Sequence, residues 1–155
     1  MNNDFSVKLY VNITMVDYLK GVIFYFEQVV FLTGTASSLA ADHLYTVEEE
    51  CGHNKFDEKQ VMAFHHAVAQ LLFASPRERK YIHTTVSLLT TRVHDPDEDS
   101  WKKLKRLILY VRRTINMPLI LRADSLTIIK WWVEASYAAH PDIIGHTGVT
   151  MTFGR

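Results

Sequence analysis

The sequence predicts an α+β fold, in which one strand precedes a run of three to four helices and further strands close the chain. Apolar and polar residues alternate near the N-terminus, and apolar residues recur at helical spacing from about residue 16 to 116. Runs rich in β-branched and aromatic residues follow Pro118. Strands that flank the helices, rather than alternate with them, favour α+β over α/β. With 48% hydrophobic residues among 155, the chain is able to bury a sizeable core.

The first strand is predicted in FSVKLYVNITM, residues 5–15, where every second residue is apolar. The segment MVDYLKGVIFYFEQVVF, residues 15–31, has apolar residues at helical spacing, although Gly21 weakens the helix. Residues 33–54 are small, polar and acidic, which is typical of a surface loop. The chain therefore enters the helical region through one helix and a long connection.

Three further helices are predicted in residues 56–74, 75–93 and 94–118. Asp57 is suited to cap the first, and Ser75 with Pro76 to begin the second. The third has acidic residues at its start and Arg112 and Arg113 in its last turn, an order that complements the helix dipole. The expected buried residues are Val61, Phe64, Val68, Leu71 and Leu72 in the first, Ile82, Thr85, Val86 and Leu89 in the second, and Trp101, Leu104, Ile108 and Val111 in the third.

Three strands are predicted after Pro118, in PLILRA, LTIIKWWV and HTGVTMTFG, with AHPDIIGH as the turn between the last two. Because neighbouring side chains of a strand point to opposite faces, Trp131 and Trp132 are expected on opposite faces, one of them in a core and the other, with Val133, exposed. The strands therefore lack a complete sheet to cover them.

Composition and charge exclude several classes of protein. Lys and Arg together number 17, as do Asp and Glu, so no overall basic field attracts nucleic acid and any such role needs local clustering. The single cysteine excludes an internal disulfide and agrees with a reducing compartment. No signal peptide or membrane span is evident, so an intracellular protein, cytoplasmic or nuclear, without a membrane partner is expected. The eight histidines form no metal-ligand spacing, so no metal or cofactor is predicted.

Two sets of residues are candidates for chemistry. Glu134 ends a predicted strand, where a carboxylate is able to hold a divalent metal, although an ordinary strand-end residue is the commoner reading. Lys102, Lys103, Arg106 and Arg113 share the outer side of the third predicted helix, where they are able to meet phosphates. The alternative is a solvated surface balanced by the acidic first turn of that helix. Spacing alone favours this alternative.

Three stretches, taken in order, resemble the pol polyprotein of copia-type LTR retrotransposons, from about Lys8 to the end of the chain. ASSLAADHLYTVEE is similar to a family segment with small residues, His-Leu and an aromatic. Residues 64–114, which contain PRERKYIHTTVSLLTTR and WKKLKRLILYVRR, resemble the helices that follow the reverse transcriptase palm. IKWWVEASYAAHPDIIGHTGVTMTFG resembles the first hairpin of the ribonuclease H domain.

The resemblance implies that residues 1–116 are the C-terminal part of reverse transcriptase and 117–155 the truncated start of a ribonuclease H-like domain. The parent would be an RNA-directed DNA polymerase with ribonuclease H that uses Mg²⁺. Glu134 stands where the family has a metal-binding Asp, and it places its oxygens on the order of 1 Å further out, beyond the tolerance of a catalytic site. No Tyr-x-Asp-Asp occurs, and only 21 residues follow Glu134. The chain is therefore expected to hold neither active site.

A non-enzymatic role follows from the same resemblance. In the family the helical region grips the primer–template, so Lys102, Lys103, Arg106 and Arg113 are expected to contact the backbone of an RNA–DNA hybrid or another nucleic acid. Trp101 and Tyr110 are expected in the core, since a duplex offers no free bases to stack on. The alternative function is an independent helical module that binds nucleic acid or protein. The sequence leaves the oligomeric state open.

Overall fold

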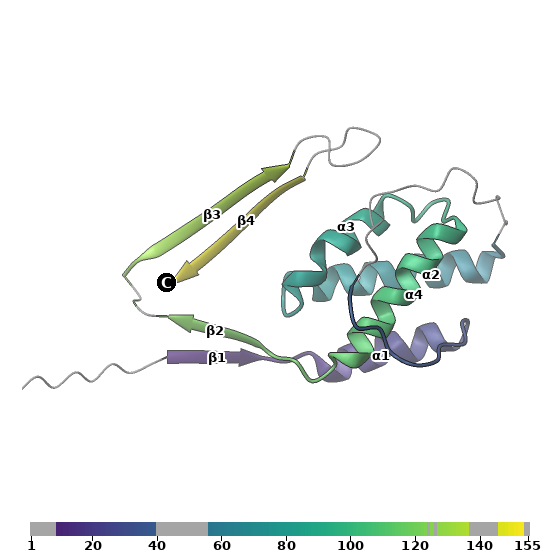
Figure 1. The fold of residues 1–155 in the computed structure, drawn as a ribbon, viewed down its shortest axis with the longest axis horizontal. Coiled ribbons are helices and arrows are strands. Elements are labelled where there is room, and N and C mark those ends of the chain that lie inside the picture. Colours follow the sequence, from purple (N-terminus) through teal and green to yellow (C-terminus); the bar gives the residue numbers. More distant parts are fainter. Residues whose placement is uncertain (1–8, 40–55, 124, 126, 137–145, 154–155) are drawn as a thin grey trace, which may run out of the picture. The chain divides into compact units, whose positions relative to one another are not determined.

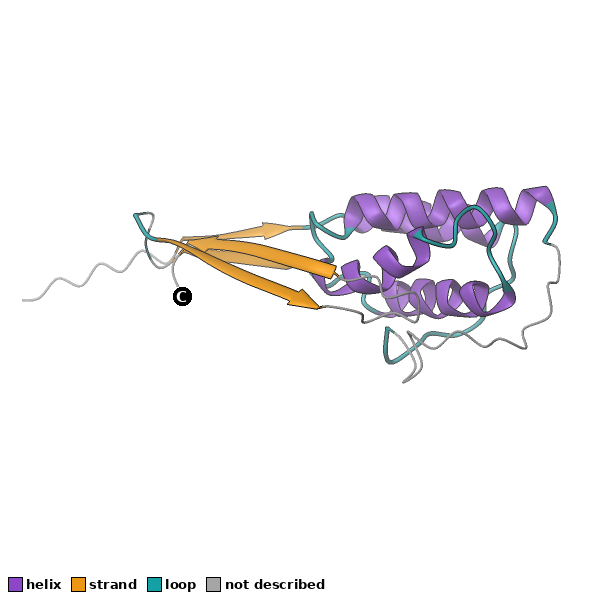
Figure 2. Cartoon of the chain, turned by 90° about the horizontal axis from the view of Figure 1, so that it is seen from above, coloured by secondary structure: helices purple, strands orange, loops and turns teal. Residues whose placement is uncertain are grey.

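A computed structural model describes residues 9–39, 56–123, 125, 127–136 and 146–153 (Figure 1). The fold is α+β, as predicted, with helices and two small antiparallel sheets. It divides into a helical unit, residues 14–118, and a strand unit formed by residues 1–13 and 119–155. All the described helices belong to the first unit and all the strands to the second (Figure 2).

The strand unit joins both ends of the chain. Strand β1, Leu9–Ile13, pairs antiparallel with β2, Leu119–Ala123, and Ile13 lies opposite Leu119. The two segments expected from the sequence, 1–116 and 117–155, differ from these units. The expected segment 1–116 contained the N-terminal strand together with the helices. Cross-strand pairing places that strand with the C-terminal segment instead. The helical unit is therefore inserted between two strands of the same ladder.

A hairpin of β3, Ile129–Ser136, and β4, His146–Phe153, forms the second sheet. Alternation along the strands makes one face of this hairpin apolar. That face carries Ile129, Trp131, Val133, Val149, Met151 and Phe153, all of them exposed. Trp132 lies on the other face and is also exposed, at 61% against 62% for Trp131. The expectation that one of the two indoles is buried is wrong, because neither face of the hairpin is covered by a second layer in the described part of the chain.

The helical unit contains α1, Val16–Glu27, α2, Glu58–Ala74, the short 3₁₀ helix η1, Lys80–Ile82, α3, His83–Thr90, and α4, Glu98–Arg113. Asp57 caps α2 as predicted and forms a capping box with Gln60, in which each side chain accepts the other's backbone N–H. Asp97 caps α4 by accepting from the Ser100 N–H at 2.7 Å. The helix starts are thus fixed by local sequence.

One contiguous core joins the helices. Its largest members are Leu19, Phe26, Phe64, Leu71, Ile82, Leu89, Trp101, Leu104, Leu107 and Ile108. The predicted buried faces of α3 and α4 are confirmed. Leu72 is an exception, at 38% exposed, because it follows Leu71 by 100° around α2 and turns to the edge of the buried face. Trp101 packs on the rings of Phe26 and Phe64, with ring centres 5.4 and 5.7 Å away.

The predicted helix start at Ser75 is wrong. Ser75 lies at the C-terminal end of α2, where its hydroxyl contacts the Leu72 carbonyl at 3.1 Å and the His83 Nδ1 at 2.8 Å. The next α-helix begins only at His83, after η1. Pro76 has no backbone N–H to donate. The residues between Ser75 and η1 form a turn, in which the N–H groups of Arg77 and Glu78 donate to the Ala74 carbonyl. Ser75 thus links two helix ends instead of starting one.

The turn between α2 and η1 buries a charged pair. The side chains of Glu78 and Arg79 are both fully buried, with Nε of Arg79 3.2 Å from a Glu78 oxygen. The guanidinium of Arg79 also donates to the carbonyls of Thr114 and Ile115, each at 2.8 Å, and to the Tyr81 hydroxyl at 2.6 Å. These carbonyls directly follow α4, and that of Thr114 also accepts from the Met117 N–H at 2.9 Å. Arg79 thus joins the turn after α2 to the turn after α4.

The cap of α4 predicts an acid-sensitive contribution to stability. Burial would raise the pKa of Asp97, but hydrogen bonds from Ser100 and the charges of Arg92 and Lys103 outweigh it and hold the pKa below the usual 3.8. A lowered folded-state pKa stabilises the fold above the unfolded-state pKa, and this stabilisation is lost as pH falls through the folded-state pKa. We expect Asp97→Asn to be less stable than the native chain at pH 7 in urea unfolding. The difference should shrink below about pH 4. A difference independent of pH would contradict this cause.

Candidate nucleic-acid interface

Helix α4 separates a buried side from a charged one. Asp99, Ser100, Trp101, Leu104, Leu107, Ile108 and Val111 are buried, and they span a little over half of the helix circumference. The opposite side carries Lys102, Lys105, Arg106 and Arg113 together with Leu109. The predicted residues Lys102, Arg106 and Arg113 do share one face. The placement of Lys103 on that face is wrong, because 100° per residue puts it between Asp99 and Leu107, inside the buried span. The cations therefore lie on the outward side of α4, and the opposite side of the helix is packed in the core.

Two of the predicted lysines are held by the acidic first turn of α4. Lys103 Nζ lies 2.5 Å from Asp99 Oδ2, and only 11% of the Lys103 side chain is exposed. Lys102 lies 3.6 Å from Glu98, and its side chain is 61% exposed. Both pairs are one helical turn apart. A phosphate would meet Lys102 readily, whereas Lys103 would first have to leave a mostly buried carboxylate.

Residues 34–38 cross the outer side of α4. Ala36 N–H donates to the Leu109 carbonyl at 3.3 Å, and Arg106 donates to the Ser38 hydroxyl at 2.7 Å. Arg112 donates to the Gly34 carbonyl at 3.3 Å and pairs with Glu27. Gly34 has a φ of +76°, which glycine adopts without strain. This segment passes alongside α4 in Figure 1 and covers part of the outer face that spacing left open.

The exposed cations of α4 are those that the segment 34–38 leaves uncovered. Arg113 is exposed in the last turn, where its charge complements the helix dipole. Lys105 is also exposed, although it was not among the predicted binding residues. Its position two residues before the apolar Leu107, or about 200° around the helix from it, was the signal that could have placed it outside. Lys102, Lys105 and Arg113 therefore form the accessible basic surface of α4.

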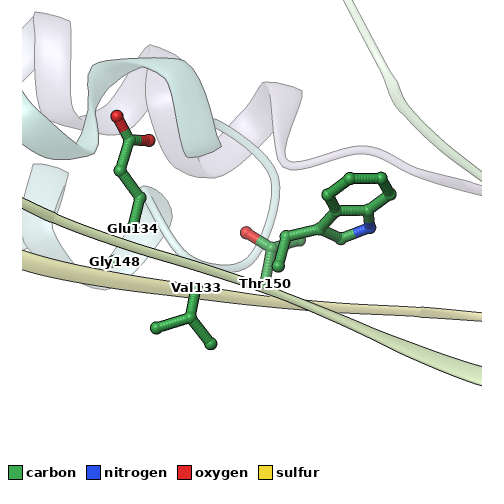
Figure 3. A pocket seen from close by; sticks show the side chains of 5 residues that line it. Val133, Glu134, Gly148 and Thr150 are labelled. Atoms are coloured by element: carbon green, nitrogen blue, oxygen red, sulfur yellow. The ribbon is translucent and has the colours of Figure 1, made fainter.

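Glu134 lies on the polar face of the β3–β4 hairpin, opposite Gly148. With Trp132, Val133, Gly148 and Thr150 it lines a shallow hollow of about 380 Å³, and Figure 3 shows the Glu134 carboxylate on the side of the hairpin away from Val133. The Glu134 side chain is exposed. Among the described residues no group of three or more His, Cys, Asp or Glu side chains is placed to hold a metal ion. Within that part of the chain Glu134 thus belongs to no such cluster.

Protein-family models, curated proteins and solved structures were each compared with the chain, and none of them matches. Within the described residues, the helices are too short or too polar to cross a lipid bilayer. The function of the chain is therefore inferred from its residues and their geometry.

Proposed function

We propose that the chain derives from the pol polyprotein of a copia-type retrotransposon and binds the sugar-phosphate backbone of an RNA–DNA hybrid through α4. The observation that carries the proposal is the accessible basic surface of Lys102, Lys105 and Arg113 on a helix whose other side is packed. The ordered resemblance of three sequence segments supports the origin. The proposal assigns no polymerase or ribonuclease H step to this chain and no resident metal, although the parent enzyme would use Mg²⁺.

The chemistry of the surface favours backbone contacts over base contacts. Lysine ammonium groups meet phosphates as point charges, whereas base recognition needs side chains that reach into a groove. Trp101 and Tyr110 face the core or its edge, since Trp101 is buried and Tyr110 packs against Tyr81 with ring centres 6.0 Å apart. Binding without sequence preference is the result that this arrangement supports. With net charge zero over the chain, affinity is expected to be weak and sensitive to salt.

We expect a double variant, Lys102→Ala with Arg113→Ala, to weaken binding of a fluorescent RNA–DNA hybrid, measured by anisotropy from low to moderate salt. Each lost phosphate contact should reduce the slope of log affinity against log salt by roughly one, so the double variant should lose about two. Both residues are exposed, so the fold should survive. Lys103 and Arg106 are left in place, because their contacts with Asp99 and Ser38 would confuse loss of binding with loss of structure.

The matched control is Lys59→Ala with Lys80→Ala, which removes two exposed cations from α2 and η1. The control should bind as the native chain does. Equal losses in both double variants would show that only net charge matters. Absence of binding by the native chain at low salt would refute the proposal.

A second candidate function is a non-enzymatic module that binds a protein. The observation favouring it is that the helical unit has a contiguous core of its own. A chain that unfolds cooperatively but does not bind the hybrid at any salt concentration would favour this candidate.

A further inference from the structure

A groove of about 550 Å³ opens in the helical unit between the turn after α1, the start of α2 and the N-terminal half of α4. Its size suits a small organic ligand. The residues that matter for its chemistry are Val29 and Phe31 from the first segment, Phe56 from the second, and Trp101, Lys102 and Lys105 from α4. The groove is distinct from the last turn of α4, where Arg113 lies.

One wall of the groove is aromatic and unusually accessible. Phe31 is 90% exposed, whereas a phenylalanine is usually buried. Phe56 is half-buried and packs on Trp101, with ring centres 5.3 Å apart. Aromatic rings gain most from other flat rings that stack on them or meet them edge to face. The wall therefore fits a planar, apolar ligand better than an extended aliphatic one.

The Trp101 indole lines the groove and carries a buried donor. Trp101 is 3% exposed, and within the described part of the chain its Nε1 has no hydrogen-bond acceptor. Nε1 is itself closed to solvent, so a ligand in the groove contacts the indole ring and not this donor. The environment of the indole N–H changes when the ring gains a neighbour, so its signal reports on occupancy of the groove.

The charges at the rim select an anion. Lys102 and Lys105 each carry an ammonium group, and among the described residues that line the groove Glu98 is the one acid. Glu98 lies 3.6 Å from Lys102, so its charge is balanced and that of Lys105 remains in excess. Ammonium groups, like the indole N–H, donate and do not accept. The complementary ligand group is an oxyanion.

We propose that this groove binds a planar aromatic anion, with the ring against Phe31 and Phe56 and the oxyanion at Lys105. Nucleotides and aromatic carboxylates share this chemistry. The inference goes beyond backbone binding by α4, because it requires a free ring and does not require Arg113.

The test follows the indole N–H signal of Trp101 by NMR in the full chain. The chain has three tryptophans, and Trp131→Phe with Trp132→Phe leaves only the Trp101 signal and so assigns it. Adenosine 5′-monophosphate and 2-naphthoate are titrated as the two sources of an aromatic anion. Adenosine supplies a ring without the charge, and ribose 5-phosphate supplies the charge without the ring. A saturable shift with either aromatic anion, larger than with adenosine or ribose 5-phosphate, is expected.

Variants locate the ligand in the groove. Lys105→Ala should weaken binding by about fivefold, as expected for one solvent-exposed charge. Phe31→Ala should weaken it as well, and since Phe31 is exposed the fold should be unaffected. Lys80→Ala, an exposed lysine outside the groove, should bind as the native chain does. The proposal is overturned if neither aromatic anion moves the Trp101 signal at millimolar concentration, if ribose 5-phosphate moves it equally, or if Lys105→Ala binds unchanged.

Discussion

Replacement of Arg79 by alanine is expected to lower the free energy of unfolding of the helical unit by about 3–5 kcal/mol. The change leaves the buried Glu78 carboxylate without its counter-charge, and one oxygen of that carboxylate already lacks a hydrogen-bond partner. It also removes two hydrogen bonds to the carbonyls that directly follow α4. Urea unfolding followed by far-ultraviolet circular dichroism measures the loss.

Arg77→Ala is the matched control for this variant, because Arg77 lies in the same turn but is exposed. Its guanidinium lies 3.7 Å from the centre of the Phe73 ring, a contact worth about 0.5–1 kcal/mol at an exposed site. Arg79→Lys should recover little, since an ammonium group cannot donate to two carbonyls in the fork geometry of arginine. Similar losses for Arg77→Ala and Arg79→Ala would mean that the buried network is not what stabilises the turn.

Trp101→Ala is the second change with a large expected effect, a loss of about 3–5 kcal/mol. Trp101 contacts the rings of Phe26, Phe56 and Phe64, which come from three different segments of the helical unit. Removing the indole leaves a cavity that these rings cannot fill without moving their backbones. The thermal unfolding midpoint, measured by circular dichroism, should fall by more than 10 °C, at roughly 4 °C or more for each kcal/mol.

Trp131→Ala provides the comparison, because Trp131 is 62% exposed on the β3–β4 hairpin. It should change the free energy of unfolding of the helices by no more than about 0.5 kcal/mol, and so leave their unfolding midpoint almost unchanged. A loss as large as that of Trp101→Ala would show that the hairpin face is covered in solution. The pair of variants thus distinguishes a packed indole from an uncovered one in the same chain.

Local sequence signals placed most of the helices and strands correctly, because their determinants are short in range. Asp57 and Asp97 begin helices by accepting backbone N–H groups three residues later, which spacing alone reveals. The start of the helix predicted in residues 75–93 was misplaced, since Ser75 and Pro76 form the same local pattern as a helix start. What decides that turn is the contact of Arg79 with Thr114 and Ile115, 35 and 36 residues away. No local pattern carries such information.

The binding surface was less predictable than the fold for the same reason. Helical spacing correctly placed Lys102, Arg106 and Arg113 on one face of α4. It gave no sign that residues 34–38 would cross that face, because the contact of Arg106 with Ser38 spans 68 residues. The groove at Trp101 was also missed, since its three sides come from segments far apart in the chain. The one residue of the groove that stands out in the sequence is Phe31, an aromatic residue that follows the end of α1.

The pairing of Ile13 with Leu119 makes the β1–β2 ladder a noncovalent crosslink around the helical unit. Closing a flexible loop of about 100 residues costs roughly 4 kcal/mol in chain entropy. A five-residue ladder does not readily offset that cost by itself, but α1 and α4 share one core, which shortens the loop that remains to be closed. The ladder is therefore expected to form cooperatively with the helices, so that each stabilises the other.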